Sequence, residues 1–187
     1  MAGILGTEEP TMSRSRIFIL VFAMCTSTAM LLAQGNPYSD DARQSYRFIK
    51  GNLLKAADKM PAEDYSFRTT PKVRTFSEMI AHVADAQMLM CAVVKGEKTI
   101  ADARFGPAKT AKADLVASLK ASFEYCDPVY QSMTDAAGTA KVKWFVGDMS
   151  KLGLLNWNIS HDNEMYGIIG AFLRIKDLVP PSSEGRP

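Results

Sequence analysis

The amino-acid sequence predicts an all-α protein, a four-helix bundle preceded by an N-terminal signal peptide. Four long segments repeat apolar residues at spacings of three and four, and no segment shows sustained alternation of apolar and polar residues. Capping residues, glycine or proline bound each segment. Because each predicted helix carries one apolar stripe, packing the four stripes together in a bundle is the simplest way to remove them from water.

Composition is typical of one globular domain. The chain has 187 residues, of which 47% are hydrophobic and 22% are charged. The net charge is +2 and no basic stripe is interleaved with aromatic residues, which argues against a nucleic-acid partner. The sequence also lacks phosphate-binding glycine loops, a Gly-x-Ser-x-Gly turn, Cys-x-x-Cys pairs and internal repeats. The enzyme classes defined by those motifs are therefore not expected.

Residues 12–33 have the order of a secretory signal peptide: a basic start, an apolar run and a small residue before a polar stretch. We place the cleavage site after Ala33, with Ala29 as the alternative. The apolar run is shorter than the roughly 20 residues of a membrane span, and Thr26 to Thr28 interrupt it. We therefore expect cleavage, with no stable membrane span afterwards, and export to the periplasm or the medium.

The remaining residues lie before and after the predicted signal peptide. Residues 1–11 precede it and are interpreted as a non-native or wrongly assigned extension. Residues 38–183 form the predicted helical domain, and residues 184–187 are a tail.

Two cysteines, Cys91 and Cys126, remain in the predicted mature domain. An oxidising compartment would allow them to form a disulfide. Each also lies in an apolar helical segment, where free cysteine packs as a small hydrophobe. We favour free, buried cysteines and keep the disulfide as the alternative.

The first predicted helix spans residues 40–60, with Ser39 or Asp40 as its cap and Pro61 as its end. Residues 61–74 then read as a connecting loop. The apolar stripe of this helix consists of Tyr46, Ile49, Leu53, Ala57 and Met60.

The second predicted helix begins at a capping box, in which Thr75 is followed three residues later by Glu78. Gly96 is its natural end. Its core stripe consists of Phe76, Ile80, Val83, Gln87, Met90 and Val94.

The third helix is predicted from about 112 to 134, kinked by Pro128, with Gly138 closing the segment. The fourth is predicted from about 148 to 176, ended by Pro180. The stripe of the third helix consists of Leu115, Leu119, Phe123, Val129 and Met133. The stripe of the fourth consists of Leu154, Trp157, His161, Met165, Ile168, Phe172 and Ile175.

The two histidines of the chain are the candidate functional residues. His161 lies at the centre of the predicted stripe of the fourth helix, where a buried imidazole needs a partner. His82 lies at the edge of the apolar arc of the second helix. Imidazoles from two helices of a bundle can share one metal ion. The alternative, which the residues alone favour, is two histidines satisfied by hydrogen bonds, with Asn158 as a partner for His161.

Three segments resemble the DinB superfamily. They are TFSEMIAHVADAQ at residues 75–87, NISHDNEMYG at residues 158–167 and LRIKDLVPPS at residues 173–182. The resemblance covers residues 40–183 and implies a four-helix bundle of the DinB/YfiT-like type. It also implies a divalent metal, commonly nickel, zinc or manganese, held by one histidine of the second helix and a His-x-x-x-His pair of the fourth.

His82 and His161 match the first two of these ligand positions, and Met165 occupies the third. Residues four apart share a helix face, so Met165 points where the third ligand would. Its thioether is a soft donor that suits Cu(I) better than the metals of the family. The implied metal site is therefore His82, His161 and Met165, in a weakened form.

Three functions remain open at this stage. The first is a divalent-metal-dependent enzyme of the thiol-dependent transferase or hydrolase type, acting on an unidentified small molecule. The second is a non-catalytic binding module with a degenerate metal site and no metal. The third, less favoured, is a copper-binding protein. The resemblance names no catalytic residue, and a homodimer is left open.

Overall fold

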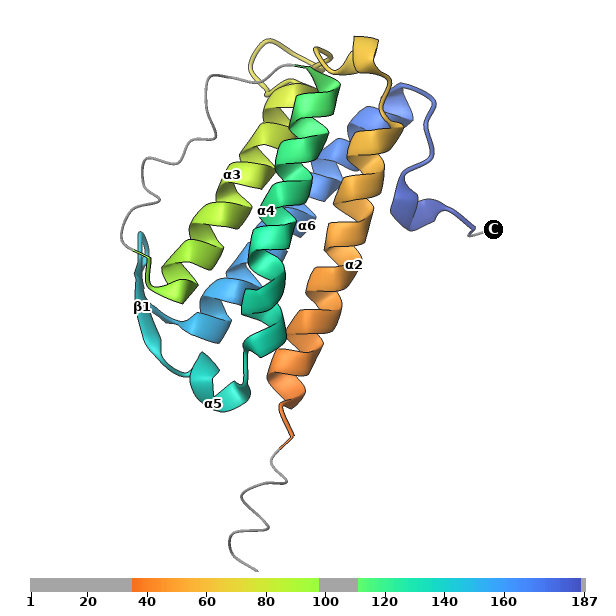
Figure 1. Ribbon diagram of the computed structural model, residues 1–187. Helices are drawn as coiled ribbons and strands as arrows, with labels where there is room; N and C mark the ends of the chain where they lie inside the picture. The colour runs from red at the N-terminus through yellow and green to blue at the C-terminus, as the bar shows by residue number, and fades with distance from the viewer. Residues whose placement is uncertain (1–34, 98–110, 186–187) are drawn as a thin grey trace, which may run out of the picture. The chain divides into compact units, whose positions relative to one another are not determined.

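The computed structural model describes residues 35–97 and 111–185, and its main feature is the predicted group of four long helices (Figure 1). The long helices are α2 (Pro37–Lys59), α3 (Phe76–Lys95), α4 (Lys112–Ser132) and α6 (Lys151–Ile175). The shorter elements are η1 (Ala62–Asp64), α5 (Asp135–Gly138), β1 (Lys141–Trp144), β2 (Gly147–Ser150) and η3 (Pro181–Ser183). The predicted signal peptide and the extension before it lie outside the described residues.

Helix α3 begins and ends where its sequence predicts. The backbone N–H of Glu78 donates to the Thr75 hydroxyl at 3.2 Å, and the Thr75 N–H donates to the Glu78 carboxylate at 2.7 Å, which completes the capping box. Gly96 ends the helix with a left-handed φ of 83°. Within the described residues, α3 is the one helix long and apolar enough to cross a membrane, a property that core helices of globular domains share.

Helix α2 begins earlier than predicted, because its cap comes from a distant residue. Its N-cap is Asn36, and neither Ser39 nor Asp40 has that role. The carboxylate of Asp135, in α5, accepts hydrogen bonds from the backbone N–H groups of Ser39 at 2.7 Å and Tyr38 at 3.3 Å. The free N–H groups of the first helical turn need hydrogen-bond acceptors. The local sequence reveals only acceptors close along the chain, so the role of Asp135 could not be predicted from it.

The predicted stripes of α2, α3 and α4 are buried, whereas the predicted stripe of α6 is buried only in part, at Leu154, Met165 and Phe172. Three of its members are exposed: Trp157 by 39%, Ile168 by 36% and Ile175 by 53%. Asn158 and Asp162 are fully buried instead, at 0%. The buried face of α6 is therefore rotated by about one residue from the predicted stripe, and polar side chains lie at its centre.

A two-stranded antiparallel hairpin, which the sequence did not predict, precedes α6. Trp144 pairs with Gly147 at its turn, where Gly147 has a φ of 119° that favours glycine. Each strand has only four residues, too few to show sustained alternation. Helix α6 consequently begins at Lys151 rather than near residue 148, capped by Ser150, whose hydroxyl accepts from the Gly153 N–H at 3.0 Å.

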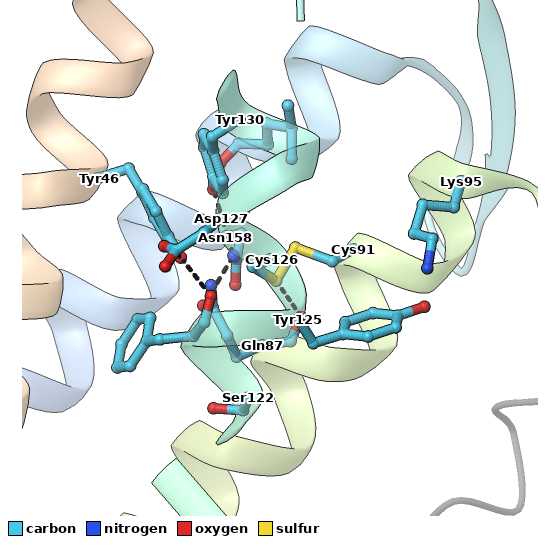
Figure 2. Close-up of a disulfide and its surroundings, with 12 residues drawn as sticks. Tyr46, Gln87, Cys91, Lys95, Ser122, Tyr125, Cys126, Asp127, Tyr130 and Asn158 are labelled. Atoms are coloured by element: carbon cyan, nitrogen blue, oxygen red, sulfur yellow. Dashed lines mark hydrogen bonds between the residues drawn. A yellow bond between two sulfur atoms is a disulfide. The ribbon is translucent and has the colours of Figure 1, made fainter. Parts of the chain in front are cut away.

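Cys91 of α3 and Cys126 of α4 form a disulfide, so the prediction of free cysteines is wrong (Figure 2). Both residues are fully buried, at 0% exposure, and their Cα atoms are 5.6 Å apart. The apolar setting that suggested free thiols is equally suited to a buried cross-link. Whether the disulfide forms or the thiols stay free depends on whether the two helices bring the cysteines together.

Hydrogen-bonded polar side chains surround the disulfide inside the bundle (Figure 2). The side-chain N–H₂ of Asn158 donates to the Gln87 amide oxygen at 2.8 Å and to the Tyr130 hydroxyl at 3.2 Å. Tyr130 in turn donates to the backbone carbonyl of Leu155 at 2.9 Å and stacks on Tyr46 with ring centroids 3.8 Å apart. This network joins all four long helices.

Removing the disulfide should destabilise the domain. The cross-link joins positions 35 residues apart, and loops of this length restrict the unfolded chain by about 2–4 kcal/mol. We expect the double variant Cys91→Ala, Cys126→Ala to lose that much unfolding free energy in urea titrations. Reductant should destabilise the parent protein and leave the double variant unchanged; two titratable thiols in the oxidised parent protein would contradict the cross-link.

Candidate metal centre

The structure brings the two histidines together from α3 and α6. The Nε2 atoms of His82 and His161 are 3.1 Å apart, and the ring planes meet at 71°. His82 is half-buried, and the side chain of His161 is 15% exposed. The predicted convergence of the two imidazoles is present, and solvent reaches it.

His161 lies at the edge of the buried face of α6 and not at its centre. The rotation of the helix places Asp162 in the interior and leaves His161 beside the neighbouring helix. The predicted hydrogen bond from Asn158 to His161 is replaced, since Asn158 donates to Gln87 and Tyr130. An edge position is compatible with an open metal site, in which the remaining ligands of the ion come from solvent.

Burial keeps the His82 imidazole neutral. It lowers the pKa of His82 to about 4, with smaller contributions from the charges of Arg74 and His161. Only the neutral ring has a lone pair to give to a metal or to accept a hydrogen bond. His82 is therefore a competent nitrogen donor throughout the physiological pH range.

Asp162 is the functional candidate that sequence reasoning missed. Its side chain is 0% exposed, and neither carboxylate oxygen has a hydrogen-bond partner among the described residues. Burial raises its pKa to about 6, while the neighbouring His161 opposes the rise. The Nδ1 atom of His161, likewise buried and without a partner in the described part of the chain, lies 3.8 Å from its Oδ1. The only signal in the sequence is an acidic residue next to the histidine. This signal is weak, because an acidic residue at that position is equally consistent with a solvent-exposed side chain.

Met165 is buried in the core at 6% exposure, one turn beyond His161 on α6. Residues 35–97 and 111–185 contain no cluster of three or more histidine, cysteine, aspartate or glutamate side chains arranged to hold a metal ion. The candidate donors that the structure brings together are thus the two imidazole nitrogens of His82 and His161. Further ligands would have to come from Met165, water or a substrate.

The separation of the two nitrogens fits a shared ion. Two imidazole nitrogens bound to one zinc-like ion at about 2.0–2.1 Å, at angles of about 90–110°, lie about 2.9–3.4 Å apart. The observed 3.1 Å falls within that range. Metal-bound histidines usually donate their second N–H to a carboxylate, and Asp162 lies next to the second nitrogen of His161. These residues therefore fit a divalent cation, with open coordination positions.

The fold and the histidine pair are those of a helical-bundle protein with a two-nitrogen centre between helices. The chain belongs to the DinB superfamily, whose family model matches residues 46–169, more than half of its length. A DinB-like protein from Bacillus cereus aligns with a TM-score of 0.63 and 18% identity, over 76% of this chain and 95% of its own. A DinB-like protein from Bacillus subtilis aligns with a TM-score of 0.60 and 16% identity, over 73% and 92%.

A mycothiol-dependent maleylpyruvate isomerase is also similar in structure. It aligns with a TM-score of 0.56 and 15% identity, over 70% of this chain and 59% of the isomerase. The comparison with curated proteins found no match. At these identities the structural matches show a common fold.

Neutralising Asp162 should stabilise the metal-free domain at neutral pH. Its pKa is raised from 3.8 to about 6, so above pH 6 the folded state holds an ionised buried carboxylate at a cost of about 2–3 kcal/mol. We expect Asp162→Asn to raise the unfolding free energy by about that amount at pH 7.5, and to give little gain near pH 3.5, where the carboxyl is protonated in the folded state and mostly protonated in the unfolded state. Thermal unfolding with a chelator present, at both pH values, measures the difference.

Glu164→Gln is the matched control, because Glu164 is an exposed acid on the same helix. It should change stability little at either pH. The titration of His82 is common to all three proteins and cancels in the comparison. A loss of stability in Asp162→Asn at pH 7.5 would show that interactions of the ionised carboxylate outweigh the cost of burying it.

Proposed function

We propose that this DinB domain is an exported, divalent-metal-dependent enzyme in which His82 and His161 hold the cation. The observation that carries the proposal is the 3.1 Å separation of two Nε2 atoms from different helices. The reaction we propose is of the thiol-dependent transferase or hydrolase type, on a small molecule rather than a nucleic acid. Nickel, zinc or manganese are the proposed ions.

The chain's own residues prepare the site for that role. The rigid helices α3 and α6 hold the two nitrogens within reach of one point, and the low pKa keeps His82 neutral. The edge position of His161 leaves the histidine pair partly exposed to solvent. A bound divalent cation would lower the pKa of a water or thiol at its open positions and polarise the substrate.

The proposed thiol chemistry is supported by one structural relative. The isomerase that shares this fold is named as mycothiol-dependent, so a bundle of this kind is compatible with a thiol co-substrate. A thiolate is a good ligand for zinc and nickel, and it would complete a centre to which the chain contributes few donors. The identity of the thiol is outside the proposal.

Met165 supports a second candidate function, a non-catalytic binding module with a degenerate metal site. A buried methionine packs as an ordinary core residue, and the two histidines can satisfy each other by a hydrogen bond across 3.1 Å. Copper is a narrower alternative, because it depends on the Met165 sulfur as a soft ligand. Metal binding separates these candidates.

Equilibrium dialysis of the mature domain against nickel, zinc, manganese and copper(I), followed by elemental analysis, tests the proposal. We expect one divalent ion per chain in the parent protein and about a tenfold or greater loss of affinity in His82→Ala and in His161→Ala, since each removes half of the nitrogen donors. Met165→His should tighten binding.

The pattern across these variants decides between the functions. Metal bound only by Met165→His would identify a degenerate site and favour the binding module. A preference for copper(I) that Met165→Leu abolishes would favour the copper alternative. Retained divalent binding in both alanine variants would place the ion elsewhere.

Export of the domain is a separate part of the proposal, and the disulfide supports it. Buried disulfides persist in oxidising compartments and are rare in reducing ones. Cys91 and Cys126 form such a bond, which agrees with the signal-peptide pattern of residues 12–33. Two unrelated features of the chain thus indicate the same kind of compartment.

Expression of the full chain in a bacterial host with a periplasm tests export. We expect the domain in the periplasmic fraction, with a mature N-terminus after Ala33 or Ala29 by mass spectrometry. Val21→Arg should prevent processing, because it places a charge in the apolar run. An unprocessed chain in the cytoplasmic fraction would contradict export and leave the metal proposal untouched.

A further inference from the structure

We infer that Asp162 is a positioning residue: its carboxylate takes a hydrogen bond from Nδ1–H of His161, which leaves Nε2 as the unprotonated nitrogen facing His82. The evidence is the 3.8 Å separation of His161 Nδ1 and Asp162 Oδ1, both buried without another partner in the described ranges. The inferred tautomer of His161 does not depend on a bound metal. Its effect on metal affinity rests on the proposed function.

The hydrogen-bonding capacities of the groups point to this tautomer. A neutral imidazole has one N–H donor and one acceptor nitrogen, and an ionised carboxylate only accepts. If Nδ1 were the unprotonated nitrogen, two acceptors would face each other in the interior, each costing the penalty of an unpaired buried polar group. With a proton on Nδ1, both groups gain a partner from one short movement, because the terminal torsion of aspartate is broad.

The two tyrosine hydroxyls on which the charge of Asp162 acts are already used. The charge of Asp162 acts on Tyr46 and Tyr130, but the Tyr130 hydroxyl donates to the Leu155 carbonyl and the Tyr46 hydroxyl lies 3.1 Å from the Phe123 carbonyl. The Nε2 of Gln87 is the competing donor, because it is buried and unpaired within the described residues and the Gln87 amide oxygen accepts from Asn158, one turn before Asp162 on α6. The tautomer of His161 in Asp162→Leu distinguishes Gln87 from His161 as the donor.

The tautomer of His161 determines that of His82. When Nε2 of His161 is the acceptor, the 3.1 Å contact requires His82 to donate from its own Nε2–H. His161 is then already in the form that binds a cation through Nε2. For a cation to bind both rings, only His82 must change, releasing a proton from Nε2 to water and taking one up from water at Nδ1.

Long-range ¹H–¹⁵N spectra of the metal-free domain at pH 8 measure the tautomers directly. Wild type should show a protonated Nδ1 and an unprotonated Nε2 for His161, with the opposite pattern for His82. Asp162→Leu removes the acceptor and should shift His161 toward the Nε2–H form. Asp162→Asn keeps a neutral acceptor and should shift it less, and Glu164→Gln should not shift it.

Metal affinity in the same four proteins, by competition with a chromophoric zinc chelator, is the second measurement. Loss of the outer hydrogen bond to a metal-bound histidine weakens binding about 10–100-fold, and we expect that loss in Asp162→Leu and a smaller one in Asp162→Asn. Glu164→Gln should bind zinc like wild type. Because Asp162→Asn is expected to be more stable than wild type, weaker binding there cannot come from unfolding.

Either measurement can overturn the inference. An unprotonated Nδ1 on His161 in wild type, or a His161 tautomer that Asp162→Leu leaves unchanged, would assign the carboxylate to another donor such as Gln87. Equal zinc affinity in wild type and both Asp162 variants would show that the carboxylate does not support the ligand. If wild type binds neither zinc, nickel nor manganese, the proposed function fails, and the tautomer spectra still decide the role of Asp162.

Discussion

The burial of polar side chains on the inner face of α6 is the constraint on which the rest of the bundle depends. Asn158 and Asp162 both have 0% exposure, in positions that apolar residues usually fill. Asn158 meets the cost of burial by bonding to Gln87 of α3 and Tyr130 of α4, which fixes the rotation of α6 against both helices. A helix held in this rotation cannot turn to bury Trp157 or Ile168 without breaking those bonds.

That rotation also creates the candidate metal centre. It moves His161 from the middle of α6's buried face to its edge, where it meets His82, and it leaves Asp162 inside next to the second nitrogen of His161. An ionised carboxylate in the interior is destabilising, and burial raises the pKa of Asp162 even though His161 opposes the rise. Residues that reduce stability at such a place are expected where a protein has a function to support, because selection on the fold alone favours an apolar residue there.

The site as a whole departs from a complete three-histidine centre. Membership of the DinB superfamily accounts for the bundle, in which His82 and His161 meet and Met165 packs in the core one turn beyond His161. Two nitrogen donors hold an ion less tightly than three, and they leave more positions for water, thiol or substrate. The same feature thus lowers the expected affinity of the site and widens the chemistry open to it.

The sequence by itself determined the four helices, the stripes of α2, α3 and α4, and the capping box at Thr75, because these depend on local periodicity and on contacts within one turn. Only the tertiary structure decided the disulfide, the cap that Asp135 gives to α2, the short hairpin, and the inner face of α6. Each of these depends on a partner far along the chain. Asp162 could not be found from the sequence for the same reason: an acid beside a histidine reads as solvent-facing until the packing of neighbouring helices shows which side of α6 is covered.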